Sequence, residues 1–240
     1  MRSTWRTLDR GLRRDIALVC LADGLVGVSY GAIAVGLGFA PWVPVLMSVV
    51  VLAGASEFLF VGIVATGGSL LAALIGGLLV NARHLPFGLA LGGVAGRGWR
   101  RILGSHLLND ESAVFALGQS DPARKRAAFW LCGIGIGLCW PLGALIGASA
   151  GAFLDDIDAF GLDAMFPTVL LALVFPALRD RATAWVAILG AVLAVAVTPI
   201  LPTGIPVLLS LVALVALIWV APHAKPESTA DAEPVPAVAS

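Results

Sequence analysis

Charged residues are scarce in this chain of 240 residues, and their scarcity excludes a water-soluble domain. Only 12% of the residues are charged, whereas soluble domains carry about 25%. Hydrophobic residues make up 59% of the sequence, and several apolar runs reach the roughly 20 residues that a helix needs to cross a bilayer. These runs do not alternate between polar and apolar positions, which argues against a membrane β-barrel. We therefore expect an all-α, polytopic membrane protein with about 6–8 hydrophobic segments.

The chain also has little of what several other classes of protein need. Its formal net charge is zero, so composition gives no reason to expect a nucleic-acid partner. Cys20, Cys132 and Cys139 all lie inside apolar runs, which favours packing roles over a disulfide framework or a metal site. The basic start runs into a hydrophobic segment without the small-residue cleavage site of a signal peptide. We expect no cofactor.

Polar segments divide the chain into three parts. Residues 1–15 form a basic N-tail, residues 16–221 a single transmembrane domain, and residues 222–240 a Pro-, Ala- and acid-rich C-tail that is too polar to order itself. Residues 97–126 form a long polar connection within the domain. The apolar runs lie at 16–40, 42–66, 69–96, 127–152, 164–178, 184–201 and 204–221.

Basic residues predict the orientation, because they are retained on the cytoplasmic side of a membrane. Residues 1–15 and 97–126 should both be cytoplasmic, as should the turn at Arg179 and Arg181, whereas the acidic segment 155–163 should lie outside. Three full crossings between the first two basic segments would put them on opposite sides. Either one apolar run is re-entrant or split into an extra crossing, or the N-tail lies outside despite its five Arg residues. We expect the first, with at least one broken or re-entrant segment in the first half, covered by protein or lining a polar cavity.

Polar residues interrupt the third apolar run in VNARHLPFG, residues 80–88. Asn81, Arg83 and His84 precede Pro86, whose ring removes a backbone hydrogen bond and clashes with the preceding turn. The sequence thus predicts a helix break near residues 82–85. A charge at the bilayer centre costs roughly 2.5–3.5 kcal/mol. Arg83 therefore either snorkels or pairs with a carboxylate to hold the fold, or it lines a polar pathway.

A second interruption lies upstream in AGASEF, residues 53–58. The small residues Gly54 and Ser56 allow close helix approach or an unwound turn. Glu57 is a natural counter-charge for Arg83, and a buried ion pair and a substrate contact are both open interpretations. Two broken segments are typical of transporters, in which half-helix ends meet polar substrate groups. An amino acid fits this chemistry, since its carboxylate suits helix N-termini and Arg and its ammonium suits carbonyl ends and Glu.

Three further acids need an explanation. Asp110 and Glu111 lie in LLNDESAVFALG, residues 107–118. They either open a helix that Asn109 or Asp110 caps, or they form a gate or proton-linked site at the cytoplasmic mouth. Asp23 lies early in the first apolar run and is either proton-linked or shallow and solvated.

An intramembrane hydrolase of the serine-protease type, with His84 as a partner of the serine, is the weakest alternative. GVSYG at 27–31 matches the G-x-S-x-G nucleophile pattern, but GASAG at 147–151 matches it too, and no strand precedes either one. The same residues belong to GxxxG spacings, which favour tight helix packing. His84, His106 and His223 lack the spacing of a metal site. We expect neither catalysis nor a bound metal.

Several stretches together resemble one protein family. In order, they are GASEF (54–58), LLVNARHLPFG (78–88), NDESAVFAL (109–117), FWLCGIGIGLCWPLGALIGASAG (129–151) and FGLDAMFPTVLLALVFPAL (160–178). Their combination resembles the AzlC family, the large subunits of branched-chain amino acid permeases, over about residues 16–221.

The resemblance implies a two-component secondary transporter in the bacterial inner membrane, and the charge pattern predicts that both tails are cytoplasmic. It would export valine, leucine and isoleucine, with methionine as a further candidate, together with a small AzlD-type membrane subunit. Transport would not use ATP, and the sequence agrees because it has no G-x-x-x-x-G-K-[ST] loop. A membrane subunit that assembles a partner without transporting anything is the alternative.

The resemblance and the residues together give the expected site. Glu57 departs from the Gln that the family often has at this position. The substrate-binding or gating residues are expected to be Asn81, Arg83, His84, Glu57, Ser56 and Gly54. The expected proton-linked or gate residues are Asp110, Glu111 and Asp23, and Pro86 is the expected helix break.

Overall fold

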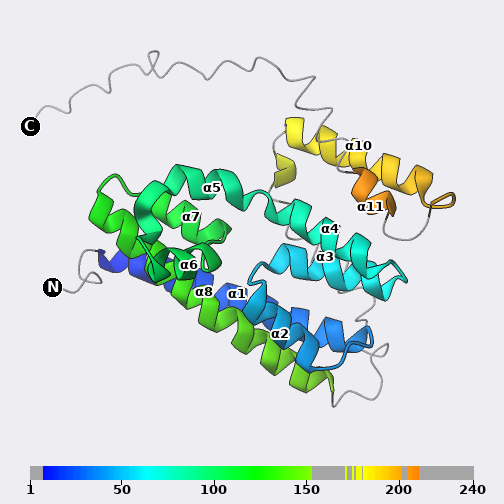
Figure 1. Ribbon diagram of the computed structural model, residues 1–240, viewed down its shortest axis with the longest axis horizontal. Helices are drawn as coiled ribbons and strands as arrows, with labels where there is room; N and C mark the ends of the chain where they lie inside the picture. The colour runs from blue at the N-terminus through cyan, green and yellow to red at the C-terminus, as the bar shows by residue number, and fades with distance from the viewer. Residues whose placement is uncertain are drawn as a thin grey trace, which may run out of the picture.

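The computed structural model describes residues 8–152, 171, 175, 177–179, 181–201 and 205–210. These residues form helices and turns, and the described ranges contain no strand (Figure 1). Three helices are long and apolar enough to cross a membrane: Arg10–Gly36, Leu70–Ala95 and Pro122–Gly151. The predicted all-α membrane class is therefore confirmed. The acidic segment 155–163 and the C-tail 222–240 lie outside the described residues.

The longest helices, α1 (Arg10–Gly36) and α8 (Pro122–Gly151), pack side by side and run in the same direction. Their first turns meet where Arg124 Nη2 donates to Asp9 Oδ2 over 2.7 Å. Asp9 also caps α1 by accepting the Leu12 N–H, and these two contacts lower the pKa of its carboxyl group. The N-tail and the 97–126 connection thus end at the same end of the molecule, as the positive-inside pattern requires.

Glycine ridges explain why α1 and α8 approach so closely. A Cβ atom at Gly27 would lie 2.8 Å from the Trp140 carbonyl oxygen, and one at Gly31 would overlap the Ala144 carbonyl oxygen. Gly143 and Gly147 face α1 in the same way. The two G-x-S-x-G matches are therefore helix-packing surfaces that lie against one another. Ser29 Oγ donates to the Leu25 carbonyl oxygen of its own helix.

The second apolar run folds into a hairpin that does not cross the molecule. After α1 ends, α2 (Trp42–Val50) runs back toward the middle of α8, where Leu52 packs near Gly137. The chain reverses at Leu52, which has φ +50°, and α3 (Gly54–Ala65) begins against Trp140. α3 then packs antiparallel to α4 (Leu70–Asn81). This hairpin is the re-entrant segment that the charge pattern predicted.

The polar connection also forms a hairpin, which the sequence analysis did not predict. α6 (Trp99–His106) begins beside the first turns of α8, and Leu107, which follows its last residue, packs on Gly133 and Gly137. α7 (Asp110–Leu117) returns to the start of α8, where Ala116 joins the cluster around Phe129. Residues 97–126 therefore reach the middle of α8.

The tips of the two hairpins meet at mid-depth. His106 Nε2 lies 2.9 Å from the carbonyl oxygen of Val49, at the end of α2. Between the hairpins, α4, α5 (His84–Leu91) and η2 (Gly92–Ala95) form one crossing that runs opposite to α8. The remaining described helices, η4 (Ala177–Arg179), α10 (Arg181–Val197) and α11 (Ile205–Ser210), follow later in the chain, and α11 contacts α4.

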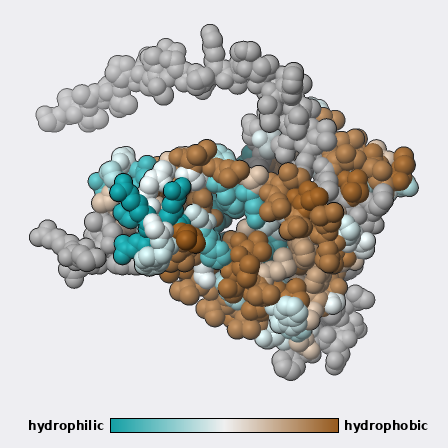
Figure 2. Space-filling model, in the orientation of Figure 1, coloured by the Kyte–Doolittle hydropathy of each residue, from teal (hydrophilic) through white to brown (hydrophobic). Residues whose placement is uncertain are grey.

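The surface has the polarity of a membrane protein. Figure 2 shows hydrophilic residues gathered at the end where α6 and the first turns of α8 lie, and hydrophobic residues over most of the remaining visible face. Large apolar side chains are exposed along both long helices, among them Leu18, Leu25, Leu138 and Leu142. Since apolar faces of this extent are unfavourable in water, these helices face lipid.

Candidate functional site

The crossing formed by α4 and α5 is broken where the sequence predicted. α4 ends at Asn81, a turn follows at Ala82 and Arg83, and α5 begins at His84. Pro86 lies in the first turn of α5 and cannot donate a hydrogen bond to the Ala82 carbonyl oxygen. That oxygen instead accepts a shorter-range bond from Leu85 N–H at 3.1 Å. Pro86 therefore places the polar residues Asn81, Arg83 and His84 around an opened turn.

Arg83 does not pair with Glu57, so the expected counter-charge was wrong. The partner of Arg83 is Asp110, the first residue of α7. Arg83 Nη2 lies 2.8 Å from Asp110 Oδ2, and Arg83 Nε donates to Oδ1 over 2.9 Å. The two side chains are 36% and 39% exposed. His84 Nε2 lies 3.8 Å from the same carboxylate, so Asp110 connects the α4–α5 break to the tip of the second hairpin.

Asn109 gives Asp110 its position. The Asn109 side chain accepts the Ser112 N–H at 2.8 Å, and Ser112 Oγ accepts the Asn109 N–H at 3.0 Å. This reciprocal capping box starts α7 and leaves the Asp110 carboxylate free of capping. The structure thus identifies Asn109 as the cap, and Asp110 as a charged group aimed at the break.

Glu57 is fully buried and anchors the tip of the first hairpin to α8. Glu57 Oε1 accepts the Ala53 N–H at 2.9 Å, and both carboxyl oxygens lie within 3.3 Å of Trp140 Nε1. The indole ring of Trp140 stacks on Tyr30 with centroids 5.6 Å apart. Glu57 therefore accepts hydrogen bonds from buried N–H groups at the reversal between α2 and α3.

Gly54 and Ser56 also stabilise the reversal between α2 and α3. A Cβ at Gly54 would lie 2.8 Å from Trp140 Cη2, so only glycine lets the start of α3 contact the indole ring. Ser56 Oγ donates to the Ala53 carbonyl oxygen at 2.8 Å. The structure brings Gly54, Ser56 and Glu57 together at one hairpin tip, away from the Arg83–Asp110 pair.

We expect Glu57→Gln to retain the stability of the protein and Glu57→Leu to reduce it. The amide oxygen of Gln still accepts a hydrogen bond, whereas Leu leaves the Ala53 and Trp140 N–H groups without an acceptor. An unsatisfied buried donor costs about 1–3 kcal/mol. Thermal unfolding of the purified variants in detergent would measure the difference. Equal melting temperatures for Glu57→Leu and the parent would contradict this role.

Asp23 and Glu111 extend the acidic character of the second tip. Both are partly buried, and the carboxyl groups of Asp23, Asp110 and Glu111 are close enough to interact electrostatically. Asp23 comes from α1 and the other two from the start of α7. Three sequence-predicted acids thus gather beside the break, although Asp110 is already paired with Arg83.

A cavity of 820 Å³ opens between the broken crossing and α6. Its polar lining consists of Asn81, His84, Arg97, Arg101 and Ser105. Its apolar lining includes Leu85, Leu89, Leu91, Leu108 and Phe129. Gly88 faces the same space, so no large side chain fills it there. A few polar groups in an otherwise apolar cavity are typical of small-molecule sites.

Asn81 is the polar group of this cavity that most needs a partner. Its Oδ1 atom is buried and has no hydrogen-bond partner among the described residues. A buried acceptor without a partner is costly in the free protein and can be satisfied by a donor on a bound molecule. The exposed guanidinium groups of Arg97 and Arg101 supply positive charge to the same cavity.

Four residues at these sites were not among the site residues predicted from the sequence. Arg97 and Arg101 were used only for orientation, and Ser105 and Trp140 were not considered. Trp140 carried one usable signal: an indole N–H inside an apolar helix requires an acceptor, and Glu57 is one of few. Arg83 precedes the lining residue His84 in the sequence, but it is not among the residues that line this cavity.

Comparisons with known proteins agree on the class of protein. The chain is 29% identical over 168 residues to the inner membrane protein YgaZ of Escherichia coli, covering 61% of this chain and 65% of that protein. It is 29% identical over 153 residues to the branched-chain amino acid transport protein AzlC of Bacillus subtilis, covering 62% and 59%. An uncharacterized membrane protein of Helicobacter pylori is 26% identical, covering 80% and 85%.

The chain spans less than two thirds of the length of the first two relatives in these matches. No solved structure matches the chain. The family model described as AzlC protein matches residues 18–154, which include both hairpins, the broken crossing, most of α1 and all of α8. This match covers more than half of the chain, so the protein belongs to the AzlC family.

Proposed function

We propose that this chain is the large subunit of a two-component secondary transporter that exports branched-chain amino acids from bacteria. The 820 Å³ cavity beside the helix break carries the proposal, because it combines an unpartnered acceptor, cationic side chains and apolar walls. The Bacillus relative, whose name states branched-chain amino acid transport, supports the substrate class. The chain would lie in the inner membrane with both tails cytoplasmic, and a small AzlD-type subunit would complete it.

The cavity chemistry suits a zwitterion with an apolar side chain. The Asn81 Oδ1 atom would accept a hydrogen bond from the substrate ammonium group. Arg97 and Arg101 would attract the carboxylate, since guanidinium groups bind carboxylates through paired N–H donors. Leu89 and Phe129 would contact the branched side chain. Valine, leucine and isoleucine have no polar group beyond these two, so apolar walls are sufficient for the rest.

The Arg83–Asp110 pair would act as a gate beside this cavity. It connects the α4–α5 break to the tip of the α6–α7 hairpin, and both residues are partly exposed. An ion pair of this kind can separate at modest cost, because water screens and solvates its charges. Its opening would let the two elements that border the cavity move apart. Glu111 and Asp23 would be the proton-linked groups next to it.

Valine efflux would test the proposed function. We expect bacteria that lack their own exporter to clear valine faster only when they express both this chain and an AzlD-type subunit. The cells would be loaded with a valine-containing dipeptide, and intracellular valine would be followed over time. A lysine-containing dipeptide is the control, because the apolar walls should not accept its cationic side chain. Unchanged valine clearance with both proteins present in the membrane would contradict transport and favour an assembly role.

A further inference from the structure

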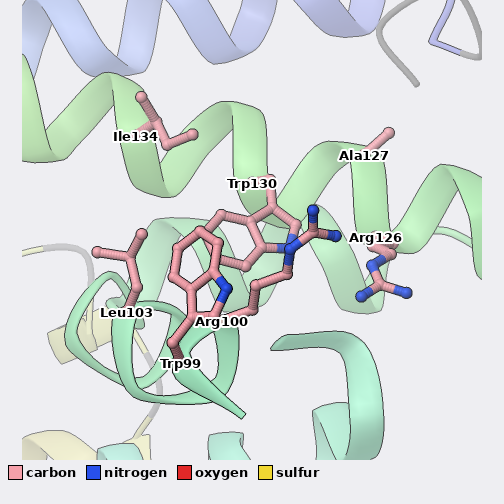
Figure 3. Close-up of a pocket in the computed structure, with 7 residues that line it drawn as sticks. All are labelled: Trp99, Arg100, Leu103, Arg126, Ala127, Trp130 and Ile134. Carbon is pink, nitrogen blue, oxygen red and sulfur yellow. The ribbon is translucent and has the colours of Figure 1, made fainter. Parts of the chain in front are cut away.

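A second cavity lies on the other side of α6, against the start of α8. It has a volume of 320 Å³. Figure 3 shows its seven lining residues, which come from α6 and α8. They are Trp99, Arg100, Leu103, Arg126, Ala127, Trp130 and Ile134. This cavity shares no lining residue with the proposed substrate cavity.

Its two cations are available for a ligand. Neither Arg100 nor Arg126 forms an ion pair with another residue of the described chain. The Arg100 guanidinium lies over the Trp99 ring, 5.7 Å from its centroid. Figure 3 shows the Arg100 guanidinium between the indole rings and the Arg126 guanidinium in this view. Arg126 packs on Gly96, where a Cβ would lie 2.8 Å from its Nη2 atom. Aromatic stacking and glycine packing thus hold both cations at the cavity without neutralising them.

The cavity lies at the depth of lipid headgroups. Arg126 and Trp130 occupy the first turns of the α8 span, and Trp and Arg at the end of a span mark the membrane interface. Trp99 is 68% exposed. Ile134 lies eight residues after Arg126, which is about 12 Å farther along the helix axis and inside the hydrocarbon region. One end of the cavity is therefore cationic and the other apolar.

We propose that this cavity binds an anionic phospholipid. The headgroup phosphate would lie between Arg100 and Arg126, which offer paired N–H donors to phosphate oxygens. The indole rings of Trp99 and Trp130 would flank the glycerol region. An acyl chain would extend over Leu103 and Ile134. A free phosphate ion would use only the cationic end, so the apolar end favours a lipid.

Binding of short-chain lipids to the purified full-length chain in a neutral detergent would test this site. The probes are dioctanoyl phosphatidylglycerol, dioctanoyl phosphatidylcholine and glycerol phosphate, and the readout is the ligand-induced shift in melting temperature. We expect phosphatidylglycerol to bind more tightly than the other two. The Arg100→Gln/Arg126→Gln variant should weaken its binding about 30-fold, because two cations near an anionic lipid each contribute to affinity.

The matched control is Arg13→Gln/Arg14→Gln, which removes the same charge from exposed residues near the start of α1, at the same end of the molecule. This variant should bind phosphatidylglycerol like the parent. If the double variant at the cavity does not fold, Arg100→Gln alone gives the same test at an exposed position. Equal phosphatidylglycerol affinity in parent and cavity variants would overturn the proposal. Equal binding of glycerol phosphate would show that the site recognises a phosphate group without the acyl chains. Loss of a co-purifying membrane subunit, with lipid binding unchanged, would show that the site is a protein interface.

Discussion

Gly147→Val is expected to remove the folded protein from the membrane. A Cβ atom at Gly147 would overlap the Val28 carbonyl oxygen and lie 2.7 Å from its carbonyl carbon. Both obstructing atoms belong to the α1 backbone, so no side chain can rotate away. Valine would have to separate α1 from α8, which are in contact along most of their length. Overpacking a core costs about 1–3 kcal/mol, and more where the backbone must shift.

The measurement is the amount of monodisperse protein that detergent extracts from membranes, followed by thermal unfolding of what is recovered. Gly77→Ala is the matched control, because its Cβ would meet Ser56 at 3.7 Å, an ordinary contact distance. Alanine also favours a helix more than glycine does. Normal yield and stability of Gly147→Val would show that α1 and α8 do not pack as described.

Arg83→Ala is expected to abolish valine efflux while the protein remains folded. Its ion pair with Asp110 is more than one third exposed on each side, and pairs of this kind contribute roughly 0–1 kcal/mol to stability. The fold should therefore survive the loss. The gate would not, since nothing else in the described residues joins the α4–α5 break to Asp110 by a bidentate contact.

Two further variants separate a gate from a general loss of charge. Arg124→Ala removes an arginine from a similar pair with Asp9, in which the side chains are 38% and 57% exposed, and should leave efflux unchanged. The exchange Arg83→Asp/Asp110→Arg should restore part of the efflux, because the pair forms again in reverse. Normal efflux in Arg83→Ala would exclude the pair from transport. No recovery in the exchange variant would instead indicate that Arg83 contacts the substrate.

Local features of the fold could be predicted from the sequence because their causes are local. Pro86 fixes the break at Ala82 and Arg83 through its missing N–H group. Asn109 and Ser112 specify the start of α7 through neighbouring backbone atoms. The need for a re-entrant segment followed from counting charges and crossings, which requires no knowledge of packing.

Contacts between distant segments could not be predicted. Arg83 could pair with either of two acids, Glu57 in the first hairpin or Asp110 in the second. The arrangement of α3 and α7 in space brings Asp110 to Arg83 and keeps Glu57 at Trp140. Glu57 binds Trp140, which is 83 residues away in the sequence. The hairpin of α6 and α7 was interpreted as a polar connection because its residues carry charges, yet its tip packs on the glycines of α8. In each case tertiary packing decided between locally equivalent alternatives.

The parallel pairing of α1 with α8 sets an order for assembly during synthesis. About 85 residues separate the end of α1 from the start of α8, and a ribosome needs roughly 4–17 s to add them. Throughout this interval the glycine face of the first helix has only lipid, the insertion machinery or the segments between α1 and α8 beside it. Both hairpins are synthesised before α8, the helix on which they pack. The nascent chain therefore passes through a loosely packed, membrane-inserted intermediate, and translation of α8 completes the packing between the two long helices.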